Sequence, residues 1–477
     1  MKKRQQPTFN IQQPSSKHRA AEAENERVAT PDAKGLRREL GTLQACGANI
    51  LNMVGIGPFI TIPLALAAMG GPQVLVAWVL GACLSACDGL VWAELGAAMP
   101  NSGGPYTYLL EAFGRHSLGR LMSFLFLWQS IVVSPLSIAS GAVGLAEYAR
   151  FLAPLTPLEV KGAAAAVCVL ATILLYRDIR SIGRISTGML FLVLGTILVI
   201  VFGGLTHLNP ARALSFPPGA WNLSTSFFSG LGAATLIAAY DYGGYYNICL
   251  IGGEVREPGR VIPRSILLAI GIVSTLYLLM TFSVISVVPW REAIRSTAIV
   301  SLFTQTLYGA GMADVMTWLI MIAAFGSVFA VMLGYSRVTY AAAVDGHFFK
   351  VFARLHPAKR FPHVSLLTLG AASALACLLD LKSLITALMV IQTMIQFLVQ
   401  CVAVMLIRSR RKDMTLPFRM PWYPLPALLA LAGWTYIVAT NGWRYVAAGL
   451  LLLLLGIGAY LWRARAASEW PFSNETV

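Results

Sequence analysis

Hydrophobic residues are grouped along this chain in twelve long runs, and short polar segments separate one run from the next. A helix needs about 20 apolar residues to cross the hydrocarbon core of a bilayer, and each run has roughly that length or more. The runs lie at 41–69, 72–98, 118–146, 158–176, 183–206, 226–253, 262–289, 312–343, 361–381, 383–407, 424–441 and 443–463. The pattern therefore predicts an all-α integral membrane protein with twelve transmembrane helices in a lipid bilayer.

Two of these runs contain residues that interrupt a helix. The first run has Gly-Ile-Gly-Pro at residues 55–58, where each Gly destabilises a helix interior by roughly 1 kcal/mol and Pro by about 3. The sixth run has Asp-Tyr-Gly-Gly at residues 241–244, at the same relative depth. Close packing of neighbouring helices is the alternative explanation for such glycines. Two matched interruptions, one with a Pro and one with an Asp, favour broken helices.

The positions of the two interruptions divide the chain into halves. They fall in the first spans of two consecutive groups of five spans, at 41–206 and 226–407. Because each group has an odd number of spans, the second group has the opposite orientation in the membrane to the first. This order is typical of transporters built as inverted repeats, whose broken helices meet near the middle of the membrane. Two additional helices follow at 424–463. We expect residues 1–40 to form a disordered cytoplasmic tail and residues 464–477 a second cytoplasmic tail.

Broken helices expose backbone groups that a continuous helix uses for its own hydrogen bonds. The half-helix after Gly57 presents unpaired N–H groups and a positive dipole, which suit a carboxylate. The interrupted stretch from Tyr240 to Gly244 presents free carbonyl groups, which suit an ammonium group. Together these groups predict a site for the zwitterion of an α-amino acid, whose side chain is selected by neighbouring apolar and aromatic residues.

Composition and charge support a membrane protein and exclude other classes. Hydrophobic residues make up 57% of the 477 residues and charged residues 12%, about half the share of charge in soluble domains. A soluble enzyme, a DNA-binding protein and a disordered scaffold are excluded, and no nucleic acid partner is expected. The net charge of +15 follows from topology, because 18 Lys and Arg lie in loops on one predicted side and 7 on the other. The positive-inside rule then places both termini in the cytoplasm.

Motifs for catalysis and for bound cofactors are absent from the sequence. The six His residues lie in the tail, in loops or at a span end, and no HExxH, GxSxG or GxxxxGK[ST] motif occurs. We therefore expect no cofactor, no metal site and no enzymatic activity. The seven Cys residues lie in or beside apolar runs, which is not the pattern of a disulfide framework. A carrier driven by a gradient, or an exchanger, fits these observations best.

Six motifs occur in a characteristic order along the chain. They are VGIGPFITIP (54–63), WAELGAAMPNSGGPYTYLLEAFG (92–114), FLWQSIVVSP (126–135), YDYGGYYNICLIGGEVREPGRVIPRSI (240–266), GYSRVTYAAAVDGHFFKVFARLHP (334–357) and RSRRKDMTLPFRMPWYP (408–424). In this order they resemble the amino acid–polyamine–organocation (APC) superfamily, and within it the L-type amino acid transporters and their bacterial relatives. The resemblance implies two inverted five-helix repeats and alternating access around a central site.

The resemblance also implies which residues bind the substrate. Residues 55–59 match a turn that holds the substrate carboxylate, although Ile56 and Pro58 depart from the usual residues and remove a hydroxyl donor. Tyr240 occupies the place of an aromatic lid over the substrate. The implied substrate-binding residues are Gly55, Ile56, Gly57, Pro58, Phe59, Val132, Val133, Tyr240, Asp241, Tyr242, Gly243 and Gly244.

Three acidic residues are candidates for gating or ion coupling. Asp88 lies deep in the second span and Asp241 in the sixth-span interruption, where a carboxylate costs roughly 2.5–3.5 kcal/mol and faces protein or water. We expect Asp241 to bind the substrate amine, a cation or a proton, with helix capping as the alternative. A buried hydrogen bond is the alternative for Asp88. The resemblance places Glu254 near the inner end of the sixth span, as a gate or in a pair with a loop arginine.

These observations favour a secondary active transporter of neutral amino acids, as a proton-coupled symporter or an exchanger, with a proton favoured over sodium. A polyamine or cationic amino acid transporter is the first alternative, because Asp241 suits a cation. A non-transporting amino acid sensor that signals through its N-terminal tail is the second. The outer loop after the third span lacks the Cys of some relatives, so the resemblance implies no disulfide-linked heavy chain. We expect a plasma membrane location, in a bacterial inner membrane.

Overall fold

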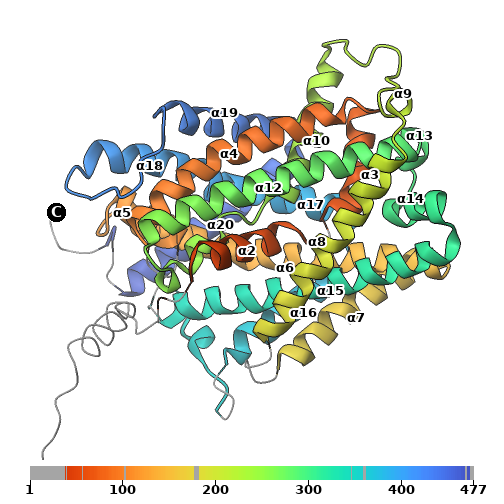
Figure 1. Cartoon of the computed structure of the whole chain (residues 1–477). Coiled ribbons are helices and arrows are strands. Elements are labelled where there is room, and N and C mark those ends of the chain that lie inside the picture. Colours follow the sequence, from red (N-terminus) through yellow and green to blue (C-terminus); the bar gives the residue numbers. More distant parts are fainter. Residues whose placement is uncertain are drawn as a thin grey trace, which may run out of the picture.

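Helices make up nearly all the regular secondary structure of the described chain (Figure 1). The structure, a computed structural model, describes residues 38, 40–55, 57–100, 104–176, 182–344, 346, 348–357, 361–467 and 470–472. The N-terminal half contains α2 (Thr42–Met53), α3 (Gly57–Met69), α4 (Val74–Ala98), α5 (Pro105–Phe113), α6 (Leu118–Leu152), α7 (Pro157–Leu175), α8 (Ile182–Thr206) and the short α9 (Pro210–Ala213).

The C-terminal half begins with a second interrupted helix. Its elements are α10 (Thr225–Tyr242), α11 (Asn247–Leu250), η2 (Gly252–Glu254), α12 (Pro258–Val287), α13 (Trp290–Ala293), α14 (Ile299–Tyr308), α15 (Ala310–Val344), η3 (Lys350–Ala353), α16 (His363–Ala376), α17 (Leu381–Gln392), η4 (Thr393–Phe397) and α18 (Leu398–Arg410). Two further helices follow, α19 (Leu425–Thr440) and α20 (Trp443–Ala467). Each of the twelve predicted runs coincides with one or more of these helices.

The described helices confirm a multi-span membrane protein. Seven of them are long and apolar enough to cross a bilayer, and the bent pair α2–α3 makes an eighth. The other predicted spans coincide with α8, α10 with α11, α16 and α19, where the apolar helical stretch is shorter or less apolar. Twelve crossings therefore remain a prediction.

The order of elements in the first half recurs in the second. In each half a broken helix is followed by one long helix, α4 or α12. A short helix comes next, with 9 residues in α5 and 10 in α14, and in the second half the four-residue α13 precedes it. A helix of 35 residues follows, α6 or α15. The predicted repeats at 41–206 and 226–407 and the inverted relation between them remain predictions.

Close packing around α4 places the two broken helices side by side. Figure 1 shows α4 and α12 running together, with α10 beside them, and α2 between this layer and the layer of α15 and α16. Glycines on α4 allow the close approach, because a Cβ at Gly81 would lie 2.8 Å from the Cβ of Ala238 on α10. A Cβ at Gly89 would lie 2.5 Å from Ile270 on α12. Small residues at such interfaces let helix backbones approach in a membrane.

The chain is already paired at residue 40, within the predicted disordered tail. Leu40 and Val255 form an isolated parallel β-bridge. The N–H of Leu40 donates to the carbonyl of Glu254, and the N–H of Arg256 donates to the carbonyl of Leu40, both at 3.0 Å. The predicted boundary is therefore wrong by at least one residue, and residues 1–37 lie outside the described part. At the other end, α20 continues to Ala467, beyond the predicted start of the second tail.

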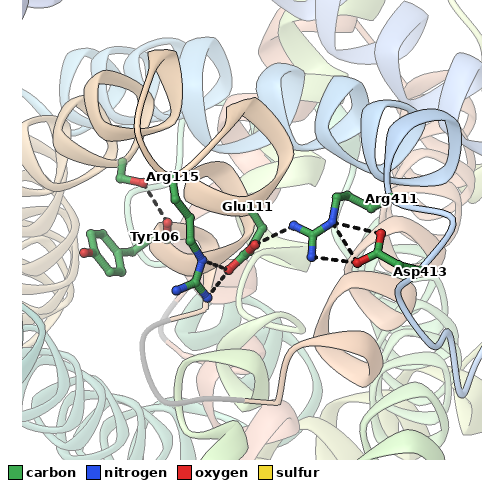
Figure 2. Close-up of polar contacts among 6 residues, drawn as sticks. Tyr106, Glu111, Arg115, Arg411 and Asp413 are labelled. Carbon is green, nitrogen blue, oxygen red and sulfur yellow. Dashed lines mark hydrogen bonds and ion pairs between the residues drawn. The ribbon is translucent and has the colours of Figure 1, made fainter. Parts of the chain in front are cut away.

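A network of charged residues joins α5 to the segment after α18 (Figure 2). Glu111 accepts hydrogen bonds from Arg115 at 2.5 Å and from Arg411 at 2.8 Å, and Arg411 also pairs with Asp413. Burial alone would raise the pKa of Glu111, but the two arginines outweigh this effect and lower it. A cavity of about 410 Å³ lies beside Glu111, and none of the residues of the two breaks lines it. This network is on the end of the molecule that is predicted to face the cytoplasm.

Candidate functional site

The first break separates α2 from α3 by a bend of 49°. Helix α2 ends at Met53, and α3 begins at Gly57, so that Pro58 lies in the first helical turn, where its missing N–H leaves no bond unmade. The hydroxyl of Tyr277 on α12 donates to the free carbonyl of Met53 at 2.9 Å. Ile56 lies outside the described residues. The predicted break of the first span is confirmed, but Gly57 and Pro58 already belong to α3. The C-terminal end of α2 is held by α12.

A second proline, Pro63, lies inside α3 and frees another carbonyl. Because Pro has no N–H, the carbonyl of Phe59, four residues earlier, receives no helical hydrogen bond. Tyr148 on α6 supplies the missing donor, with its hydroxyl 2.6 Å from the Phe59 carbonyl. Phe59 itself is fully buried. Helix α6 thus fixes the beginning of α3 at the break.

The second break begins slightly later than the sequence indicated. Helix α10 continues through Tyr242, so Tyr240 and Asp241 are still helical, and the non-helical turn covers residues 243–246. We had expected the interruption to start at Tyr240, but Asp and Tyr are tolerated in a last helical turn, whereas two successive glycines are not favoured. Gly244 has a φ of +111°, and a Cβ there would lie 2.9 Å from the carbonyl carbon of Asn52. Only glycine fits this close approach to α2 without strain.

Backbone groups at the second break are left without helical partners. Among the described residues, no backbone N–H donates to the carbonyls of Asp241, Tyr242 or Gly243. The helix resumes with the four-residue α11, where the side-chain oxygen of Asn49 on α2 accepts the N–H of Ile248 at 3.1 Å. The two inner segments are therefore tied to each other, and the free carbonyls remain at the end of α10.

The two breaks adjoin each other, as predicted. A Cβ at Gly57 would touch Oδ1 of Asp241, and it would lie 3.7 Å from the ring of Tyr240. Asp241 is 2% exposed; its Oδ2 is hydrogen-bonded to the hydroxyl of Thr61 on α3, and its Oδ1 has no hydrogen-bond partner among the described residues. The beginning of α3 and the end of α10 thus form one buried site.

Helix α6 reaches this site through Ser140, which the sequence had not indicated. The hydroxyls of Ser140 and Tyr240 lie 2.9 Å apart. Val132 and Val133 are on the same helix, about 10 Å nearer to its beginning along the axis. Val133 is buried and Val132 is partly buried, and their role in lining the site remains a prediction.

Tyr242 and Asp88 have partners that tie helices together around the site. The hydroxyl of Tyr242 donates to the carbonyl of Trp78 at 3.2 Å, and its ring stacks on Tyr277 with 5.8 Å between ring centroids. Its side chain therefore packs between α4 and α12, away from the break. Asp88 is fully buried and accepts hydrogen bonds from Tyr245 at 2.5 Å and from Trp434 of α19 at 3.0 Å. Asp88 thus connects the second break to an additional C-terminal helix.

Glu254 lies at the end of the segment that follows the second break. Its charge interacts with that of Arg337 on α15, and its carbonyl accepts the N–H of Leu40. Arg337 lies within a helix, and the predicted pair of Glu254 with a loop arginine remains a prediction. This arrangement joins the N-terminal segment, the sixth span and the eighth span near one end of the bundle.

Several polar residues near the breaks were missed by sequence reasoning. Gln392 donates to the hydroxyl of Tyr246 at 2.8 Å and to Gln396 at 3.0 Å, where the helix adopts π geometry in η4. Glutamines at 392, 396 and 400 repeat every four residues in an otherwise apolar run, and this spacing is a signal that the sequence carried. Thr61 gives no comparable signal, because Thr is common in transmembrane helices as a partner for backbone carbonyls.

Comparison with known proteins shows the family of this chain. A family model described as amino acid permease matches residues 40–460. An uncharacterized transporter of Mycobacterium tuberculosis is 32% identical over 363 residues, which is 73% of this chain and 76% of that protein.

Two relatives with named substrates cover more of the chain. The branched-chain amino acid permease BcaP of Bacillus subtilis is 26% identical over 464 residues, 93% of this chain and 96% of the permease. The Asc-type amino acid transporter 1 of Mus musculus is 26% identical over 476 aligned residues, 94% of this chain and 85% of the transporter. This chain therefore belongs to the amino acid permeases of the APC superfamily, and it is an amino acid transporter, not an enzyme.

Proposed function

We propose that this protein transports neutral amino acids by alternating access, as a proton-coupled symporter or an exchanger. The observation that carries the proposal is the contact between the first turn of α3 and the last turn of α10 at Gly57 and Asp241. A substrate carboxylate is attracted to the N–H groups and positive dipole at the beginning of α3. A substrate ammonium group is attracted to the unpaired carbonyls at the end of α10.

The substrate side chain is expected to lie against Tyr240, whose ring adjoins Gly57 and whose hydroxyl is held by Ser140. An aromatic ring and the apolar residues around it favour an uncharged side chain. The branched-chain amino acid permease is named for amino acids with uncharged side chains, which supports the same substrate class here. We propose Gly55, Ile56, Gly57, Pro58, Phe59 and residues 240–244 as the central binding segments, with Val132 and Val133 beside them.

We also propose that Glu254 belongs to an inner gate. Its interaction with Arg337 joins the sixth span to α15, and its backbone holds the N-terminal segment at Leu40. Release of substrate to the cytoplasm requires these contacts to rearrange. In this proposal the protein lies in the plasma membrane of a bacterium with both termini in the cytoplasm, and it needs no disulfide-linked partner subunit.

Purified protein in proteoliposomes tests the substrate class. We expect uptake of leucine-like amino acids to exceed uptake of lysine and of polyamines, and an inward proton gradient to stimulate it more than a sodium gradient. A thermal-shift screen of all amino acids identifies ligands independently, because a ligand that binds only the folded state raises the unfolding temperature. Absence of both binding and uptake for every amino acid would contradict the proposal.

A transporter of polyamines or cationic amino acids is the second candidate, and one observation favours it. Asp241 is buried with an unpartnered carboxylate oxygen, which would suit an ammonium group of the substrate side chain. Thermal stabilisation by polyamines and lysine but not by leucine would support this candidate. A non-transporting sensor would instead bind amino acids in the screen and show no uptake.

A further inference from the structure

The hydrogen bonds of Thr61 bear on the protonation state of Asp241. The Thr61 hydroxyl lies 2.9 Å from the carbonyl oxygen of Gly57 and is also in hydrogen-bond contact with Oδ2 of Asp241. A hydroxyl carries a single hydrogen and can donate to only one of these oxygens. If Thr61 donated to Asp241, no hydrogen would lie between the Thr61 hydroxyl oxygen and the Gly57 carbonyl oxygen, which are 2.9 Å apart and would repel each other.

A protonated Asp241 resolves this conflict. Donation from Thr61 to the carbonyl four residues earlier is the common hydrogen bond of Thr within a helix. The hydrogen of the second contact then comes from Asp241, whose carboxyl group donates to the Thr61 oxygen. Each hydroxyl hydrogen has one acceptor in this arrangement, and it links the end of α10 to the first turn of α3.

Among the described residues, no positively charged side chain interacts with Asp241. Asp241 is 2% exposed and forms no ion pair with a described Lys, Arg or His. The titratable side chains that interact with it are Tyr240, Tyr242 and Tyr277, which are uncharged at neutral pH. An isolated buried carboxylate is costly, and such a group usually binds a proton instead.

The other helices packed against α10 also bring no described charged side chain into contact with Asp241. On α4, Cys83 interacts with Tyr242 and not directly with Asp241. The two carboxyl groups of α4 have other partners, Tyr245 and Trp434 for Asp88 and Arg408 for Glu94. Helices α17 and α19 carry Lys382 and Tyr436 as their titratable side chains. Lys382 is at the beginning of α17, and Tyr436 donates its hydroxyl to the carbonyl of Phe228.

We propose that Asp241 binds the coupling proton, and that its protonation admits the substrate carboxylate to the beginning of α3. This inference rests on the proposed function, because it assumes that a zwitterion binds there. Oδ1 of Asp241 already lies against Gly57, so an ionised Asp241 and a substrate carboxylate would place two negative charges at one helix end. When a proton neutralises Asp241, the substrate carboxylate can bind at this helix end.

This arrangement makes binding of the proton and of the substrate mutually favourable. By thermodynamic linkage, if the proton increases the affinity for the substrate, the substrate increases the affinity for the proton by the same factor. The chemical step is the reversible formation of one O–H bond at Asp241 on one side of the membrane and its loss on the other. Thr61 acts as a positioning residue, because its hydroxyl holds the carboxyl group of Asp241.

The dependence of leucine uptake on external pH tests the proposal in proteoliposomes. Because only the protonated fraction binds substrate, the apparent KM of the wild type is expected to rise by up to about tenfold per pH unit once Asp241 ionises. Asp241→Asn mimics the neutral acid, so its KM should be low and independent of pH, and leucine exchange should proceed without proton uptake. Asp314→Asn, at an exposed carboxyl on α15, is the matched control and should behave as the wild type.

Thr61 provides a second pair of variants. Thr61→Val removes the hydroxyl at nearly constant shape and should shift the pH profile of KM while leucine exchange continues. Thr61→Ser keeps the hydroxyl and should restore the wild-type profile. An unchanged profile in Thr61→Val would overturn the positioning role, even if Asp241→Asn failed to fold.

Two results would overturn the role of Asp241. One is an Asp241→Asn variant that keeps the pH dependence and proton uptake of the wild type. The other is a folded Asp241→Asn variant that no longer binds leucine in the thermal-shift assay, which would make the ionised carboxylate a ligand for the amine. Failure of the wild type to transport any amino acid would instead refute the proposed function, and the coupling proposal with it.

Discussion

Gly57 shows how the lack of a side chain shapes the central site. It is the first residue of α3, and the space that its Cβ would occupy is taken by Oδ1 of Asp241 and, 3.7 Å away, by the ring of Tyr240. The beginning of α3 therefore lies directly against the end of α10. A larger residue would separate the two breaks.

We expect Gly57→Ala to reduce amino acid uptake by at least about tenfold, which corresponds to a change of roughly 1.4 kcal/mol in the binding free energy. The added Cβ would overlap the carboxyl group of Asp241, which would have to move away from Thr61. Uptake in proteoliposomes measures the effect. Gly271→Ala on α12 is the control, because no atom lies within 4 Å of its added Cβ, and its uptake should match the wild type.

Tyr148 and Pro63 illustrate a compensation between two residues on different helices. Pro63 deprives the carbonyl of Phe59 of its helical donor, and the Tyr148 hydroxyl replaces that donor at 2.6 Å. The bond is buried, so its loss would leave a carbonyl without a partner in an apolar environment.

Tyr148→Phe is therefore expected to destabilise the protein by about 1 kcal/mol, with a small fall in the thermal unfolding temperature in detergent. Tyr308→Phe is a suitable comparison, because Tyr308 is 47% exposed and its loss should change stability less. Equal stability of Tyr148→Phe and the wild type would show that the Phe59 carbonyl finds another donor.

At the scale of elements, short helices depend on their neighbours for stability. Helix α11 has only four residues, and an isolated helix of this length does not form in water. The Asn49 side chain caps it, Gly244 packs on the end of α2, and the Leu40–Val255 bridge closes the far end. The inner parts of the first and sixth spans are thus linked at three points.

Helix α5 is likewise held by charge contacts, through Glu111 with Arg115 and Arg411. The side chain of Arg115 is 64% exposed and that of Arg411 is 37% exposed, so the two ion pairs of Glu111 differ in their access to water. We expect Glu111→Gln to destabilise the protein by about 1–3 kcal/mol at neutral pH, since two charged donors lose an ionised acceptor.

The pH dependence of this effect follows from the lowered pKa of Glu111. A carboxyl with a lower pKa in the folded state contributes stability above its unfolded pKa, and loses it as the pH falls through the folded pKa. The difference in stability between wild type and Glu111→Gln should therefore be largest near neutral pH and shrink in acid. Thermal unfolding at several pH values measures it, and a difference that grows in acid would contradict the assignment.

At the scale of the whole molecule, the described chain forms one bundle in which both breaks are enclosed by helices from both halves and by α19. The bundle is joined to the N-terminal segment at Leu40, through the bridge to Val255. This bridge lies after residue 35, so a chain without residues 1–35 keeps it.

We expect a chain that lacks residues 1–35 to keep its rate of amino acid uptake to within about twofold, because the bridge and all transmembrane helices remain. The same truncation should not change the stability of the bundle. A chain that still binds amino acids but has lost a signalling output, with no uptake before or after truncation, would support the sensor alternative instead.

The sequence by itself determined the class of molecule, the places of the helices, the two interruptions and the family. These features follow from local properties: apolar runs of membrane length, Gly and Pro within them, and short motifs in order. The end of α10 was placed three residues too early, because a local rule cannot tell whether Tyr240, Asp241 and Tyr242 keep their helical conformation.

Only the tertiary structure decided which side chains meet at the breaks. Thr61 faces Asp241, Ser140 faces Tyr240 and Gln392 faces Tyr246, although each pair is far apart in sequence. The tertiary structure also brings Tyr245 and Trp434 to Asp88, to which both donate hydrogen bonds. The physical reason is that a polar group in an apolar span must find a partner, but the packing of whole helices selects which partner it finds.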